Sequence, residues 1–249
     1  VDYSYIYTIV VAVNVQKDEQ PPNYETILSG TSTSIYVSLE NIYLTISYGY
    51  KTSLYRVHIE SGSVSRAADG EVSGWVLNQF SMDEYRGYFR IATTSQINSF
   101  PEPSRLLQTQ NNLYILNKDL KIVGKLENMA QGEKIYSVRF MGDLCYIVTF
   151  RKVDPFFVID LSNPYNPEIL GELKISGYSD YLHIYDENHV IGVGKETLPA
   201  EEGDFSWYQG VKISIFDTSN ITEPKELAKY EIGDRGTDSP VLHDHKAFL

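Results

Sequence analysis

Two stretches of this chain repeat the same wording at a constant distance. Residues 157–175 read FVIDLSNPYNPEILGELKI, and residues 214–232 read SIFDTSNITEPKELAKYEI. Asp160 and Asp217 lie 57 residues apart. The same interval relates Ser162 to Ser219, Asn163 to Asn220, Pro167 to Pro224, Leu170 to Leu227 and Ile175 to Ile232. A constant period over a whole unit indicates a repeat architecture, such as a solenoid, a propeller or another array.

The composition favours strands over helices. The chain is 42% hydrophobic and contains 20 Tyr and 10 Phe, residues that suit a pleated, half-buried surface. At 249 residues, we expect positions 1–249 to form a single all-β domain. The most apolar run, YIYTIVVAVNV at 5–15, is too short to span a bilayer, so it predicts a strand and no transmembrane segment.

The repeat unit contains four predicted strands. Hairpin patterns, with apolar residues alternating on both sides of a short polar turn, occur at 34–46, 78–93, 136–150 and 181–194. A third strand follows each hairpin, at 53–59, 112–117, 155–161 and 211–217, and a less apolar fourth strand follows at 63–72, 120–128, 167–175 and 224–232. Four antiparallel strands whose apolar character declines from first to last predict a propeller blade with a buried inner strand and a solvated outer strand.

The two chain ends each predict part of one further blade. Residues 240–249 (PVLHDHKAFL) read as the start of a first strand, and 5–15 and 24–30 read as a third and a fourth strand. Strands from both ends could close the ring, which would leave no unpaired edge. We therefore predict a propeller of about five four-stranded antiparallel blades.

Two long connections are candidates for function. They span 194–211 and 93–111, and both are predicted to lie on the same face of the ring. In the first, Phe205, Trp207 and Tyr208 predict a contact surface for a partner, because aromatic residues are enriched at interface hot spots. The alternative is that these side chains fold back over their own blade.

Polar residues recur where one predicted blade passes to the next. Asp180 precedes His183, and Asp238 precedes His243 on a predicted strand. Together with Arg151 and Lys152, these residues predict a polar rim at the mouth of the central channel, which would bind a small polar ligand, a peptide or a cation. The alternative is that the pairs only tie neighbouring blades together. The repeated Asp160 and Asp217 predict structural turns.

The sequence offers no catalytic motif. G-x-S-x-G, Walker A, HExxH and paired CxxC patterns do not occur, so we assign no catalytic residue. The single cysteine, Cys145, lies in an apolar run and is expected to be buried and inert. A net charge of −12 argues against nucleic-acid binding.

Metal binding has only weak support from the sequence. His243, Asp244 and His245 cannot converge on one ion from a strand, because neighbouring side chains point to opposite faces. Glu201, Glu202 and Asp204 could hold a structural calcium ion through oxygen ligands. No other cofactor is expected.

Three longer stretches carry a family resemblance. They are GWVLNQFSMDEYRGYFRIATT (74–94), the run from RFMGDLCYIVTF (139–150) through YDENHVIGVGKE (185–196), and IGDRGTDSPVLHDHKAFL (232–249). With them the chain resembles a family of secreted or surface-attached prokaryotic, largely archaeal proteins that carry a C-terminal β-propeller domain distantly related to WD repeats. The resemblance implies a propeller, export from the cytoplasm and continuation past the position of Leu249. It implies no activity.

These observations together predict a non-catalytic, extracytoplasmic binding or scaffold module. Its expected partners are a protein, a peptide or a small polar ligand, bound by loops on one face of the propeller. The competing hypothesis is a hydrolase or lyase that uses acidic residues around the channel mouth.

Overall fold

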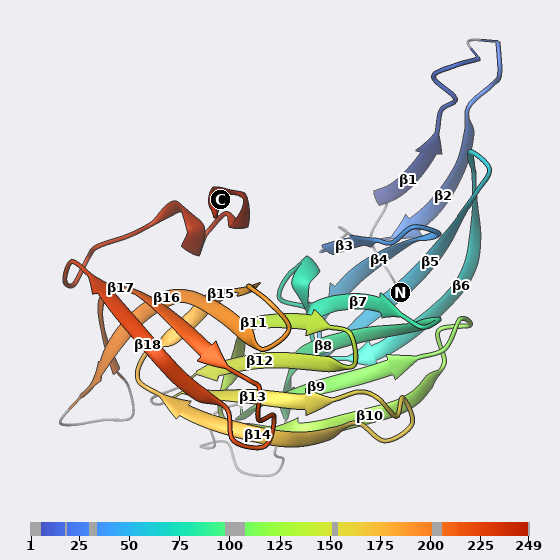
Figure 1. The fold of residues 1–249 in the computed structure, drawn as a ribbon. Coiled ribbons are helices and arrows are strands. Elements are labelled where there is room, and N and C mark those ends of the chain that lie inside the picture. The colour runs from blue at the N-terminus through green and yellow to red at the C-terminus, as the bar shows by residue number, and fades with distance from the viewer. Residues whose placement is uncertain are drawn as a thin grey trace. The chain divides into compact units, whose positions relative to one another are not determined.

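Antiparallel β-sheet makes up most of the described part of the chain. The structure is a computed structural model and describes residues 6–17, 19–29, 34–97, 108–150, 154–200 and 206–248. Within these residues, four sheets have four strands each and a fifth has two (Figure 1). The chain divides into two compact units, residues 1–96 with 112–125 and residues 97–111 with 126–249. The expectation of one domain stays a prediction.

The strands fall in the order that the sequence predicts. The first four-stranded sheet contains β3 (Ser34–Val37), β4 (Asn41–Tyr48), β5 (Lys51–Glu60) and β6 (Ser63–Ser73). The second contains β7 (Met82–Tyr85), β8 (Tyr88–Ile97), β9 (Gln108–Leu116) and β10 (Ile122–Met129), and a short 3-10 turn, η1 (Gln79–Ser81), precedes it. The predicted hairpins at 34–46 and 78–93 are therefore confirmed.

The other two four-stranded sheets both lie within residues 126–249. One contains β11 (Lys134–Met141), β12 (Leu144–Phe150), β13 (Asp154–Asp160) and β14 (Glu168–Ile175). The other contains β15 (Tyr178–Ile184), β16 (His189–Pro199), β17 (Ser206–Asp217) and β18 (Lys225–Ile232). Figure 1 shows the last sheet in orange and red. Each strand pairs with the next one in sequence, as expected for hairpin-connected blades.

The fifth sheet pairs β1 (Ile6–Ala12) with β2 (Asn23–Ser29). One face is partly covered, because Val10 and Ala12 pack against a core that contains Ile27, Leu44 and Val57. On the other face Ile9, Val11 and Tyr24 are all more than half exposed. This sheet confirms the prediction that the N-terminal region supplies two strands of a blade.

Local turn chemistry follows the sequence closely. Between β7 and β8, Arg86 and Gly87 both have positive φ angles, 51° and 79°, as a two-residue type I′ turn requires. In the repeated turns, the Asp160 carboxylate accepts the N–H of Ser162 at 2.8 Å, and the Asp217 carboxylate accepts the N–H of Ser219 at 2.8 Å. Both aspartates are therefore structural turn residues, as predicted.

Aromatic rings dominate the core between the β11–β14 sheet and the β15–β18 sheet. The rings of Phe156 and Phe216 stack with centroids 4.6 Å apart, and both side chains are fully buried. Val158, Val190 and Ile175 belong to the same core. Burial of each such side chain contributes roughly 1.5–3 kcal/mol, so this contact is a main source of stability for residues 126–249.

Burial declines across each of these sheets from the early strands to the last. β12 is almost wholly buried and includes Cys145, which is fully buried as predicted. β18, by contrast, is exposed along most of its length. In addition, β11 lies beside β15, whereas β14 and β18 make few mutual contacts. The first strands are therefore the inner ones.

The predicted strand at 240–249 is wrong. The chain forms two short 3-10 turns there, η2 (Pro240–Leu242) and η3 (His245–Ala247). Pro240 occupies the first turn, and the Asp244 carboxylate accepts the N–H of Lys246. A lone segment without a neighbouring strand gains no ladder hydrogen bonds, so local turns replace it. Among the described residues, no helix is long and apolar enough to cross a membrane.

Candidate binding site

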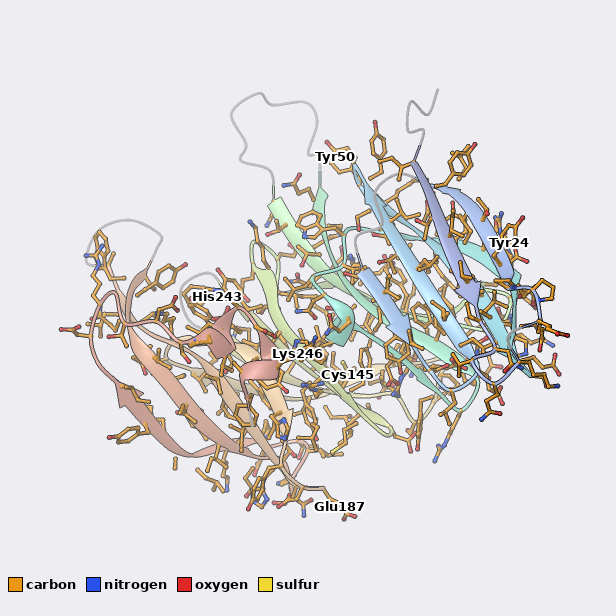
Figure 2. All side chains as sticks on the ribbon, turned by 90° about the horizontal axis from the view of Figure 1, so that it is seen from above. Tyr24, Tyr50, Cys145, Glu187, His243 and Lys246 are labelled. Carbon is orange, nitrogen blue, oxygen red and sulfur yellow. The ribbon has the colours of Figure 1, made fainter. Side chains whose placement is uncertain are left out.

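The predicted site residues occupy three different places. Asp180 and His183 lie on the inner strand β15, whereas Asp238 and His243 lie in the segment that follows β18. Figure 2 labels His243 on this C-terminal segment, together with Lys246. Arg151, Lys152 and Phe205 lie outside the described residues.

Four ionisable side chains gather at one end of β15, and we name them the Asp180 cluster. They are Asp180, Lys195 of β16, Asp238 and His243. The His243 Nε2 atom lies 3.0 Å from Asp238 Oδ2, and the Lys195 Nζ atom lies 3.9 Å from Asp238 Oδ1. Lys195 also donates a hydrogen bond to the carbonyl of Thr237. The cluster therefore attaches the C-terminal segment to the sheet.

A β-bulge gives Asp180 its position. The β15–β16 register shifts between Ser179 and Tyr181, so Asp180 is the extra residue and has no direct partner on β16. The pKa of Asp180 is raised to about 7: burial is the largest cause, His243 and Lys195 oppose the shift, and the Asp238 carboxylate adds a smaller increase. A hydrogen bond from His243, with one from the Ser239 N–H, instead lowers the pKa of Asp238. The two neighbouring carboxyls therefore differ: the pKa of Asp180 is raised and the pKa of Asp238 is lowered.

His183 belongs to a different group of side chains. Its Nδ1 atom lies 3.3 Å from the Tyr181 hydroxyl, and its ring centroid lies 4.7 Å from that of Phe248. The Arg139 guanidinium lies over the Tyr181 ring, and its Nε donates to the carbonyl of Leu182 at 2.8 Å. The structure therefore brings Asp180, Asp238 and His243 together but places His183 in an aromatic contact.

The predicted aromatic loop is largely a strand. β16 and β17 pair beyond the end of the sheet, with Thr197 opposite Tyr208 and Leu198 opposite Trp207. We call residues 197–199 and 206–208 the β16–β17 arm. Trp207 and Tyr208 thus lie on β17, not in a loop as predicted, because the hairpin is longer than its apolar pattern suggests.

Three large side chains of this arm are exposed. Leu198 is 57% exposed, Trp207 45% and Tyr208 47%. The Arg235 guanidinium lies 4.6 Å from the Trp207 ring centroid, a cation–π contact that holds the indole in place. The Tyr208 ring contacts Tyr178 edge-on at 5.6 Å. Trp207 and Tyr208 therefore keep nearly half of their surface exposed and are not fully folded back over their own blade.

A buried charge network lies at the base of the arm, and sequence reasoning missed it. We name it the Glu196 cluster. The Glu196 carboxylate accepts from Lys229 Nζ at 2.8 Å and from the Ser176 hydroxyl at 3.1 Å. Lys212, whose side chain is 1% exposed, donates to the Ser176 carbonyl and lies 3.6 Å from Glu226. A lysine inside the apolar run VKISIF was the available signal, because a buried ammonium requires a carboxylate partner.

The pKa values of the Glu196 cluster reflect these contacts. Burial alone would raise the pKa of Glu196, but hydrogen bonds from Lys229, the Thr197 N–H and Ser176 lower it overall. Hydrogen bonds to Glu196 and Glu231 raise the pKa of Lys229. Both groups therefore stay charged and paired at neutral pH, which fixes the base of the arm.

A cleft of about 410 Å³ opens between the arm and the outer strand. Its lining includes Glu196, Leu198, Gln209, Lys229, Glu231 and Asp234. A volume of this size suits a small ligand or one or two side chains of a peptide. The cleft thus combines an apolar wall with convergent polar groups.

The metal hypotheses gain nothing from the geometry. Among the residues that the structure describes, no three His, Cys, Asp or Glu side chains are placed to hold a metal ion. Glu201, Glu202 and Asp204 lie outside those residues. His243 directly follows η2 and contacts Asp238, whereas His245 lies in η3 and its ring contacts the Tyr181 ring.

The repeated sheets identify the class of fold as a β-propeller, and the comparisons agree. The chain matches the model of the Beta propeller domain family over residues 2–249, and it belongs to that family.

Two relatives are uncharacterized archaeal proteins. One, from Archaeoglobus fulgidus, is 46% identical over 196 residues, which is 78% of this chain and 28% of that protein. The other, from Methanocaldococcus jannaschii, is 46% identical over 198 residues, which is 80% of this chain and 29% of that protein. The chain thus spans under a third of the length of the curated relatives it matches.

A solved structure is also similar. It is a neuraminidase-like protein of A/little yellow-shouldered bat/Guatemala, with a TM-score of 0.46 and 12% identity, covering 85% of this chain and 70% of that one. A score at this level supports no argument about function.

Proposed function

We propose that this chain is a non-catalytic binding module that holds a protein or peptide partner with the β16–β17 arm and the adjoining cleft. The observation that carries the proposal is the exposure of Leu198, Trp207 and Tyr208 on a two-stranded projection. Aromatic residues held on a rigid element lose little side-chain entropy on binding and dominate interface energies. The Glu196 cluster supplies that rigidity.

The chemistry of the cleft defines the kind of partner. In the cleft, Leu198 offers apolar contact, while Gln209, Glu231 and Asp234 offer hydrogen-bond acceptors. Trp207, opposite Leu198 on the arm, adds an exposed aromatic surface beside the cleft. A peptide with an apolar anchor and donor groups beside it satisfies both kinds of surface. We therefore expect short extended peptides to bind beside the arm.

Selection from a phage-displayed random peptide library tests the proposal. Peptides enriched on the wild-type chain should bind Trp207→Ala at least about tenfold more weakly, as loss of a hot-spot side chain predicts. Tyr165→Ala is the matched control, because Tyr165 is an exposed aromatic residue in the same unit but on a turn. Both variants should keep the wild-type melting temperature. Failure to enrich any peptide, or equal binding by Trp207→Ala, would count against the proposal.

We also propose that the module acts outside the cytoplasm. This proposal rests on the resemblance to secreted and surface-attached proteins, and it concerns the whole protein. Antibodies against this chain should label intact archaeal cells that express the full-length relative. Labelling only after the cells are lysed would contradict export.

A hydrolase or lyase is the second candidate function. It is favoured by Asp180, because a carboxyl with a pKa near 7 can donate a proton at neutral pH. Two observations weigh against it: Asp180 does not line the cleft beside the arm, and Asp238 is already paired with His243. A panel of chromogenic glycosides tests this candidate. Turnover that Asp180→Asn and Asp238→Asn both abolish would support it.

A further inference from the structure

One face of the β15–β18 sheet packs against the β11–β14 sheet, and the other face carries large apolar side chains that are exposed. On the first face, Phe216 and Val190 join the core shared with β11–β14. The other face, which we name the second face, carries Ile191 opposite Ile215 and Ile213 opposite Tyr230. On it Ile215, Leu227, Tyr230 and Ile232 are between 38% and 70% exposed.

The 57-residue repeat shows what the second face is built to do. Ile213, Ile215, Tyr230 and Ile232 correspond to Phe156, Val158, Leu173 and Ile175 of the preceding sheet. The strand register is the same in both, with Phe156 opposite Leu173 as Ile213 is opposite Tyr230. The four earlier residues pack in the core against β15–β18. The second face therefore repeats, residue for residue, a surface that packs against a following sheet.

The shape of the second face fits the same role. It contains a hollow of about 420 Å³, lined by Tyr185, Asp186, His189, Ile191, Ile215 and Leu227. Between the preceding pair of sheets, an aromatic side chain of the following sheet, Phe216, packs on the equivalent face and stacks on Phe156. A volume of this size accommodates a bulky aromatic side chain, such as a residue in the place of Phe216 would supply.

The path of the chain after β18 indicates where a following sheet would begin. The segment crosses back over the second face, since Thr237 contacts Lys195 and η2 lies against β15 and β16. At its end, the Phe248 ring lies 5.5 Å from Tyr181 and 4.7 Å from His183, both on β15. After β14 the chain likewise passes to β15, which lies beside the inner strand β11. Phe248 therefore lies beside β15, where the inner strand of a following sheet would lie.

We propose that the second face binds a further four-stranded sheet of the same repeat, supplied by the same polypeptide in the longer proteins of this family. The relatives support this source, because the matched region makes up only 28% and 29% of their length. An apolar face of this extent on a sheet is otherwise a site for aggregation. This proposal concerns a surface separate from the β16–β17 arm.

Cysteine labelling tests the proposal directly. Leu227→Cys is made in this chain, and a cysteine is placed at the equivalent position of the full-length Archaeoglobus fulgidus protein, from which other reactive cysteines are removed. Tyr165→Cys, on an exposed turn, is the control in both proteins. The rate of reaction with a maleimide is measured under native conditions, and Ile215→Cys repeats the test at a second position. Cys145 is fully buried and should not interfere.

In this chain we expect Leu227→Cys and Tyr165→Cys to react at similar rates. In the full-length relative, the Leu227 position should react at least about 100-fold more slowly, with the Tyr165 position unchanged. Equal reaction at the Leu227 position of both proteins would overturn the proposal. A second result would also overturn the proposal. If Leu227→Cys in this chain becomes more protected as the protein concentration rises, and light scattering gives a doubled mass, the second face is occupied by a second copy of the chain.

Discussion

Ile175 at the end of β14 and Ile232 at the end of β18 are the same residue at the same place in the repeat, yet the first is 4% exposed and the second 44%. Val158 and Ile215 differ in the same way, at 0% and 38%. Both sheets have the same register and the same Asp-x-Ser-Asn turn. Local sequence thus sets the form of each sheet, while a neighbouring sheet sets its burial.

The largest effect should come from the matched isoleucines. Ile175→Ala should lower the free energy of unfolding by about 3 kcal/mol, because it leaves a cavity in the core beside Phe156. Ile232→Ala should cost less than about 1 kcal/mol, because its side chain already contacts water. Urea denaturation at equilibrium measures both. Equal losses would show that the second face is covered in solution.

A second matched pair concerns backbone approach between the sheets. A Cβ at Gly171 would overlap the Ile221 carbonyl and the Pro224 ring of the following sheet. Gly171→Ala should therefore cost about 2 kcal/mol. Its repeat equivalent is Ala228 on the exposed strand β18, where Ala228→Gly should cost about 0.5–1 kcal/mol through backbone entropy. Thermal unfolding of the two variants measures the difference, and a neutral Gly171→Ala would contradict the close approach.

We also expect stability to depend on pH. This dependence comes from the Asp180 cluster, which lies at the end of the second face that the C-terminal segment covers. The folded-state pKa of Asp180 is raised from 3.8 to about 7, so the folded state favours the protonated carboxyl. Its contribution to stability is full below pH 4 and is lost as the pH rises through 7. We expect a loss of about 2 kcal/mol between pH 5 and pH 7.

Asp180→Asn should remove this part of the pH dependence, as measured by urea denaturation across that range. Asp217→Asn is the control and should leave the slope unchanged, because hydrogen bonds from Ser219 lower the pKa of Asp217 and keep it ionised. A slope that survives in Asp180→Asn would mean that the carboxyl is hydrated and the segment is not packed over it.

The smallest effect concerns the feature that both sheets share. Asp160→Ala and Asp217→Ala each remove the hydrogen bonds that the carboxylate accepts from the backbone and side chain of the serine two residues on, in an exposed connection. Their melting temperatures should fall slightly and by the same amount, because neither turn depends on the covering of a sheet face. A much larger loss in one variant would show that the two turns are not equivalent.

The sequence predicted the parts of the fold that depend on local pattern. Alternating apolar residues and short polar turns located all the hairpins, and the constant 57-residue interval predicted the turns at Asp160 and Asp217. These signals suffice because hairpin partners lie next to each other in sequence. The segment at 240–249 was misjudged because a strand also needs a neighbour, and sequence similarity to an earlier strand does not supply one.

The candidate site was predicted less completely. Asp180, Asp238 and His243 do come together, but the bulge that turns Asp180 toward them left no trace in the alternating pattern. Glu196 lies at a second register shift, between Lys195 and Thr197, and was missed for the same reason. Glu226, the partner of Lys212, and Glu196, one partner of Lys229, lie 14 and 33 positions away along the chain, on other strands, so these pairs emerge only from the sheet register.

We argue above all that the β11–β14 and β15–β18 sheets share one structure and differ because a neighbouring sheet covers only the first on this side. Hydrogen exchange of this chain, followed by mass spectrometry, tests this central claim most directly. Amides of β13 and β17 occupy equivalent central strands, and both strands pair on either side. We expect β17 to exchange at least about tenfold faster than β13, because one face of its sheet is open to water. Equal protection of the two strands would contradict it.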